Sequence, residues 1–105
     1  MTRYVLGLYR RVPGRPTLSD ERTNEIQEGH MANLRRLTER GDLITAGPFE
    51  EDSELRGAMI FTTGSVDEAK RLLGDDPAIA NGRLVLDLYT WFGPAGLKVG
   101  ARRVP

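Results

Sequence analysis

The chain has 105 residues, 39% of them hydrophobic, and its 15 basic and 15 acidic residues cancel to a formal net charge of zero. This length predicts one domain, residues 1–105, that can bury a core. The balanced charge argues against a nucleic acid or an anionic membrane as partner, because both attract a basic surface. Cysteine is absent, which excludes disulfides, thiolate nucleophiles and thiolate metal ligands.

The first predicted element is a strand over residues 4–11, which ends before a loop with two prolines and a glycine, residues 12–16. We expect neither a signal peptide nor a membrane-spanning segment, because the apolar runs are too short for either. The sequence therefore predicts a soluble, cytoplasmic protein.

A helix is predicted over residues 19–40. Ser19 offers a capping hydroxyl, and Gly41 is a common helix stop. Four residues of this helix recur at a spacing of three or four and should face inward: Ile26, His30, Leu34 and Leu37.

The second half of the chain predicts two more strands, a helix and a final strand. The strands cover residues 43–46, closed by Gly47-Pro48, and residues 58–63. A capping box at residues 65–68 opens the helix. Asp76 and Pro77 then begin a short helical turn, the last strand covers residues 84–92, and an irregular tail follows over residues 94–105.

The order of these elements is β-α-β-β-α-β. This order is typical of the ferredoxin-like α+β fold, with one antiparallel sheet and both helices on one face. The last two strands are largely apolar on both faces. The two helices can cover only one face of the sheet, so the other apolar face stays uncovered. We assign Met59, Phe61, Tyr89 and Trp91 to that face. A second copy of the chain is the simplest cover, which predicts a homodimer by sheet-to-sheet packing; the alternative is the tail folding back.

His30 is the only histidine, and it lies on the apolar face of its helix. An inward-facing imidazole is a candidate acid-base group, because it can give and take a proton near neutrality. The alternative is a core histidine whose nitrogens are hydrogen-bonded within the fold. Position alone favours the second reading.

Several motifs resemble those of the YCII-related family. The resemblance spans residues 4–91, and its specific elements are the helical histidine in Gly29-His30-Met31-Ala32-Asn33-Leu34, Gly47-Pro48 and Asp76-Pro77. It implies a dimeric α+β barrel, with the fold of the muconolactone isomerases. It also implies that His30 and Asp76 form a catalytic pair, with elimination on chlorinated hydroxyaromatics as the associated chemistry. Ala78 departs from the bulkier residue expected after the Asp-Pro pair.

Asp76 also has a structural explanation, since an aspartate before a proline that opens a helical turn is a common N-cap. Paired with His30, its carboxylate would fix the tautomer and raise the basicity of the other ring nitrogen. Four more residues are candidates for substrate binding: Tyr9, Arg11, Gly47 and Pro48. Arg11 could anchor an anion or be a solvated strand end, and Gly47-Pro48 could admit a ligand or end the strand.

Other chemistries lack the residues they need. With one histidine and no cysteine, we expect no metal site, and no loop has the residues of a phosphate-binding P-loop, so we expect no cofactor. Two functions remain. One is a small enzyme that transfers a proton, in an isomerisation or elimination, on a small cyclic or carbonyl-bearing metabolite. The other is a non-catalytic ligand-binding or accessory dimer.

Overall fold

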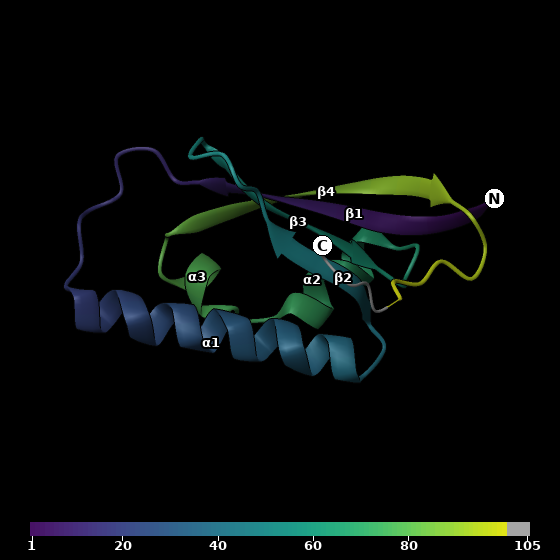
Figure 1. Cartoon of the computed structure of the whole chain (residues 1–105), viewed down its shortest axis with the longest axis horizontal. Coiled ribbons are helices and arrows are strands. Elements are labelled where there is room, and N and C mark those ends of the chain that lie inside the picture. Colours follow the sequence, from purple (N-terminus) through teal and green to yellow (C-terminus); the bar gives the residue numbers. More distant parts are fainter. Residues whose placement is uncertain (101–105) are drawn as a thin grey trace, which may run out of the picture.

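A computed structural model describes residues 1–100 and shows one antiparallel sheet with its helices on one side (Figure 1). The strands are β1 (Thr2–Arg11), β2 (Leu43–Pro48), β3 (Leu55–Phe61) and β4 (Leu84–Gly93), and the helices are α1 (Asp20–Glu39), α2 (Val66–Leu73) and α3 (Pro77–Ala80). The strand order is β2-β3-β1-β4. This is the predicted ferredoxin-like α+β fold, which is confirmed. None of the helices within residues 1–100 has the length and apolar character needed to cross a membrane.

The helices begin where the sequence predicts, at side chains that satisfy backbone N–H groups. Ser19 Oγ accepts a hydrogen bond from the backbone N–H of Arg22 (3.1 Å), and Ser65 Oγ accepts one from Glu68 (3.2 Å). Each cap supplies a partner for a donor that the first turn of a helix leaves unpaired.

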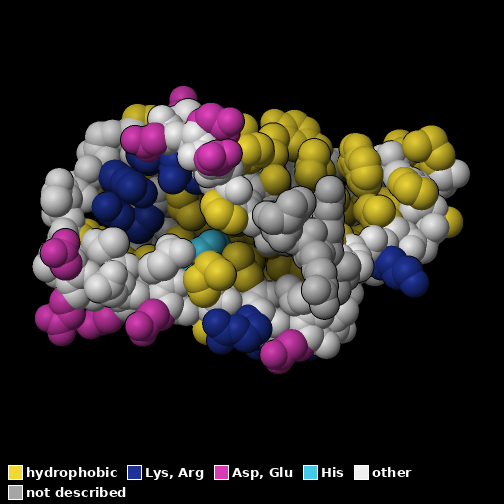
Figure 2. Space-filling model, viewed as in Figure 1, with side chains coloured by type: hydrophobic (Ala, Val, Ile, Leu, Met, Phe, Trp, Pro, Cys, Tyr) yellow, Lys and Arg dark blue, Asp and Glu magenta, His cyan; other side chains and the backbone are white. Residues whose placement is uncertain are grey.

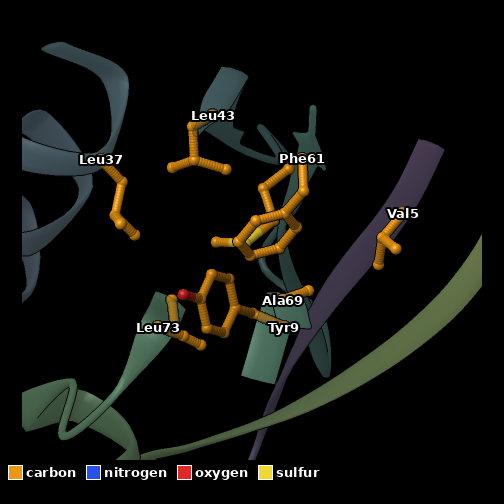
Figure 3. Packing of buried hydrophobic residues seen from close by; sticks show 8 residues of the cluster. Val5, Tyr9, Leu37, Leu43, Phe61, Ala69 and Leu73 are labelled. Carbon is orange, nitrogen blue, oxygen red and sulfur yellow. The ribbon is translucent and has the colours of Figure 1, made fainter. Parts of the chain in front are cut away.

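The core lies between the sheet and the helices (Figure 3). Its buried members are Val5, Tyr9, Leu37, Leu43, Met59, Phe61, Ala69 and Leu73. Gly7 makes room for one of them, because a Cβ at that position would lie 2.8 Å from Met59 Cγ. Side chains of the neighbouring strands β3 and β4 therefore fill the space over the middle of β1.

The predicted face of β3 is wrong. Met59 and Phe61 are 1% and 0% exposed and lie in the core, whereas we assigned them to the uncovered face. Phe61 pairs with Val5 of β1 and Leu43 of β2, so it shares their inward face. Because β3 is apolar on both faces, its alternation alone could not decide which set points inward.

The bounds of β2 and β3 also differ from the prediction. Gly47-Pro48 does not close β2 but belongs to it, and β2 tolerates a proline because it is an edge strand of the sheet. β3 begins and ends earlier than predicted. Backbone hydrogen bonds from Phe49 to Arg56 (2.9 Å) and from Arg11 to Glu54 (2.8 Å) continue the pairing of both neighbours to the start of β3.

The outward face of the sheet is apolar, although its members differ in part from the predicted ones. Leu6 of β1 lies opposite Ile60 of β3 on one side and Tyr89 of β4 on the other. Trp91 lies on the same face and contacts Tyr4 at a ring-centroid distance of 6.0 Å. This surface is called the outward face below.

The described part of the tail, residues 94–100, covers one end of the outward face. The Tyr4 hydroxyl donates to the carbonyl of Pro94 (2.6 Å) and accepts from the N–H of Leu97 (3.1 Å). Tyr89 remains 52% exposed. Residues 94–100 form no helix or strand, as predicted, and the rest of the predicted irregular tail, residues 101–105, lies outside the described residues.

Candidate active site

His30 points from α1 toward the sheet, as its spacing predicts. Ile26, His30 and Leu37 are the buried residues of α1, and His30 is 7% exposed. Its imidazole meets the ring of Tyr9 on β1 edge to face, with the ring centroids 5.2 Å apart. The histidine is therefore held between the helix layer and the sheet.

Asp76 lies beside His30 although 46 residues separate them in the chain. His30 Nδ1 is 2.9 Å from both carboxylate oxygens, so the predicted contact is present. The same carboxylate accepts from the backbone N–H of Ala78 (3.0 Å) as the N-cap of α3, and from Asn33 Nδ2 (3.0 Å). Asp76 is thus both a helix cap and the partner of the histidine.

The ionised carboxylate fixes the tautomer of the neutral imidazole. A carboxylate only accepts hydrogen bonds, so Nδ1 carries the proton and donates it, and Nε2 of the neutral ring is left as the acceptor. Burial alone would raise the pKa of Asp76, but the hydrogen bonds from His30 and Asn33 hold it below its usual value. Within residues 1–100, Nε2 has no hydrogen-bond partner.

A close contact between two helices brings this pair together. Gly29 precedes His30 on α1, and a Cβ at this position would lie 2.8 Å from Cγ of Pro77 at the start of α3. Only glycine allows α3 to approach α1 so closely without a shift of one of them. The spacing of α1 and α3 therefore sets the distance between His30 and Asp76.

His30 lines a cavity of about 530 Å³ between α1 and the sheet, whereas Asp76 is not among the lining residues. In Figure 2 the histidine is visible in a hollow of the surface, with a group of basic side chains beside it. The lining is mostly apolar and includes Ile26, Met31, Leu34, Ala46, Ala78 and Leu84. Asp76 can therefore act on a ligand in this cavity only through His30.

The candidate binding residues divide into two groups. Tyr9, Gly47 and Pro48 line the cavity, as a binding role requires. Arg11 shares the face of Tyr9, but its guanidinium pairs with Asp52 at 2.9 Å and is not among the groups that line the cavity. Its strand end lies beyond the cavity, at the acidic turn that precedes β3.

Sequence reasoning missed four functional candidates. Three arginines line the cavity: Arg15, Arg56 and Arg83. They follow β1, begin β3 and precede β4, and in an antiparallel sheet these three strand ends meet at one edge. The fourth is Asn33, which orients Asp76 and lies three residues after His30, a spacing that places both on one helix face.

Tyr9 carries a buried hydroxyl with no hydrogen-bond partner among the described residues. Burial, and then the negative charge of Asp76, raise the pKa of Tyr9 above its ordinary value, so the phenol stays protonated. An unpaired buried hydroxyl costs roughly 1–3 kcal/mol.

The variant Tyr9→Phe is therefore expected to unfold at a higher denaturant concentration, with a gain of about 1 kcal/mol. Urea unfolding followed by circular dichroism measures this change. Tyr4→Phe is the matched control, because the Tyr4 hydroxyl makes two hydrogen bonds and its loss should destabilise the protein. A loss of stability in Tyr9→Phe would show that the Tyr9 hydroxyl has a partner.

Taken together, these features define a small ferredoxin-like domain with a buried His–Asp pair behind an apolar cavity. A family model described as the YCII-related domain matches residues 4–91. The chain belongs to this family, as the resemblance of its motifs predicted. No curated protein matches the chain.

Among solved structures, the chain is similar to 5-chloro-2-hydroxyhydroquinone dehydrochlorinase (TftG) from Burkholderia phenoliruptrix AC1100, in a complex with 2,5-dihydroxybenzoquinone. The TM-score is 0.61 and the sequence identity 20%, over 87% of this chain and 95% of that chain. At this identity the similarity supports the fold.

Proposed function

We propose that this protein is a small enzyme that transfers a proton, in an elimination or isomerisation, on a small cyclic or carbonyl-bearing compound. His30 is the acid-base group, and Asp76 is the residue that positions it. The observation that carries the proposal is the imidazole at the cavity wall, with Nδ1 bound to Asp76 and Nε2 without a partner among residues 1–100.

This arrangement suits proton abstraction. The carboxylate keeps the proton on Nδ1 and stabilises the imidazolium that forms when Nε2 takes a proton from the substrate. The electron pair of the broken bond then forms a new double bond. In an elimination the leaving group departs with its own bonding electrons, and in an isomerisation the proton returns from Nε2 to another atom of the substrate.

The cavity and the similar enzyme both favour a compound with one ring. A volume of about 530 Å³ lies in the usual range of small-molecule sites, and its apolar lining suits a planar ring. The similar structure is that of a dehydrochlorinase, whose name describes the loss of chloride from a hydroxylated aromatic ring. We propose the same class of elimination here.

The direct test is to incubate the purified protein with 5-chloro-2-hydroxyhydroquinone and follow chloride by ion chromatography. We expect chloride release above the rate without protein, and a release that is about 10²–10⁴-fold slower with His30→Asn. The same assay on other halogenated hydroxyaromatic rings would define the range of leaving groups. Equal rates for the wild type and the variant across this set would overturn the proposal.

A non-catalytic ligand-binding protein is the second candidate function. It is favoured by the bond from Ala78 to Asp76, because a helix cap explains this aspartate without any chemistry. The two functions differ in what His30→Asn does. In a binding protein this change chiefly lowers thermal stability, whereas in an enzyme it removes turnover.

We also propose that the protein forms a homodimer through the outward face. Leu6, Ile60 and Tyr89 form one apolar row across three strands, and Tyr89 is 52% exposed in the single chain. An apolar patch on a sheet face that no helix covers is typical of a protein interface. A second copy of the same face covers both patches at once.

Tyr89→Asp is expected to shift the protein from dimer to monomer at micromolar concentration. The charge is tolerated in a monomer because the position is half exposed, but sheet-to-sheet packing would bury it without a partner. Size-exclusion chromatography with light scattering measures the mass. Asn24→Asp adds the same charge on an exposed position of α1 and should leave the mass unchanged. A monomeric wild type would contradict the proposed dimer.

A further inference from the structure

We infer that the cavity at His30 binds its ligand as an anion, whose negatively charged oxygen lies among the guanidinium groups of Arg15, Arg56 and Arg83. This inference rests on the proposed function of the same site and names the class of compound: a single ring that carries a carboxylate or an ionised hydroxyl. The apolar lining would hold the ring, and the arginines would hold the charge.

Uncharged backbone groups hold the three arginines in place. Arg15 donates to the carbonyl of Arg83 (2.7 Å), and Arg83 donates to the carbonyl of Pro16 (2.7 Å). Arg56 donates to the carbonyls of Glu51 and Ser53, both at 3.3 Å. These hydrogen bonds fix the guanidinium groups without neutralising them, and each group keeps further N–H donors for a ligand.

The cluster carries more positive charge than its protein partners cancel. Among the described residues, no carboxylate lies within 4.0 Å of Arg15 or Arg83. Arg56 is 3.5 Å from one oxygen of Asp52, which Arg11 already binds at 2.9 Å. The cluster is therefore cationic, although the chain as a whole has no net charge.

Arg10 of β1 shows the other way in which this protein holds an arginine, namely by pairing it with a carboxylate. Arg10 points to the outward face of β1 and binds both oxygens of Asp87 on β4, at 2.5 and 3.1 Å. A structural arginine in this protein thus has its own carboxylate. The three cavity arginines keep their geometry and leave their charge for another group.

The electrostatics of Arg15 agree with this reading. Burial lowers the pKa of Arg15 from its ordinary value, and the charges of Arg83, Arg11 and Arg56 lower it further. The cationic form is therefore less favourable here than in water, and a bound anion would relieve the repulsion. Planar guanidinium groups also match the two oxygens of a carboxylate.

Benzoate and benzamide have the same ring and nearly the same shape, but only benzoate is an anion. A comparison of their affinities therefore measures the effect of the charge. We expect benzoate to bind the protein about tenfold more tightly than benzamide, because hydrogen bonds to a charged group are stronger than those to a neutral one. Titration followed by two-dimensional NMR of the amide groups measures both affinities. The difference should shrink in high salt, because salt screens the charges.

Substitutions assign the effect to the cluster. Arg83→Gln and Arg56→Gln should each weaken benzoate binding about tenfold and leave benzamide binding unchanged. Arg71→Gln is the matched control, because Arg71 is exposed on α2, outside the cavity, and should change neither affinity. Two separate variants keep the test decisive if one of them fails to fold.

The outcomes distinguish this inference from the proposed function. Equal binding of benzoate and benzamide to the wild type would overturn the anion site, while chloride release that depends on His30 would still support the enzyme. His30→Asn should retain the preference for benzoate, because binding the charge does not require the base. Loss of benzoate binding in Arg71→Gln would also overturn the inference, since the attraction would then come from the general surface charge.

Discussion

His30→Asn is expected to lower turnover by a factor of about 10²–10⁴ while the protein stays folded, because general acid-base catalysis contributes roughly that factor. The asparagine amide can still donate a hydrogen bond to Asp76, so the buried carboxylate keeps a partner. The amide cannot take up a proton near neutral pH. Chloride release and a thermal unfolding curve, measured on the same preparation, separate the two effects.

Two further measurements make this result specific. The variant should remain a dimer by light scattering, and it should still bind benzoate, because the arginine cluster is unchanged. Retained turnover in a folded His30→Asn protein would assign the histidine to the core and leave the non-catalytic function. A large fall in thermal stability together with unchanged turnover would lead to the same conclusion.

Asp76→Ala is expected to cause the largest loss of stability, about 3–5 kcal/mol, because three hydrogen-bond donors lose their acceptor and each unsatisfied buried donor costs roughly 1–3 kcal/mol. The substitution leaves three donors without their acceptor: His30 Nδ1, Asn33 Nδ2 and the N–H of Ala78. Urea unfolding measures the loss. Asp75→Ala is the matched control. Asp75 precedes Asp76 in the chain and its side chain is exposed, so its loss should change the stability little.

The lowered pKa of Asp76 also predicts how the stability of the fold depends on pH. This pKa is lowered in the folded protein, so the unfolded chain takes up the proton more readily. The stability from the ionised form is therefore present above the unfolded pKa of an aspartate and is lost as the pH falls through the folded value. Asp76→Asn should weaken this acid-side loss. An identical pH profile for the wild type and the variant would contradict the lowered pKa.

The order of the elements and the helix starts could be predicted because their signals are local. Ser19, Ser65 and Asp76 each cap a helix through a backbone group two or three residues away. The inward position of His30 followed from the spacing of apolar residues in one helix. The contact with Asp76 followed from the family resemblance, since nothing near either residue indicates it.

The face of β3 and the arginine cluster could not be predicted because both depend on contacts far apart in the chain. Phe61 points inward because its neighbours Val5 and Leu43 do, and only the pairing of three strands shows this. Arg15, Arg56 and Arg83 meet because three strand ends share one edge of the sheet. The spacing of 27 residues between the last two carries no such signal by itself.

Gly29 exchanges local helix stability for the geometry of the site. A glycine inside a helix costs about 1 kcal/mol relative to alanine, and α1 accepts this cost one residue before the histidine. The space of the missing side chain is filled by Pro77. A search for thermostable variants guided by helix propensity would select alanine here, and would separate the two helices that hold the imidazole and its carboxylate. At this position the helix propensity of α1 and the packing that holds the His–Asp pair therefore favour different residues.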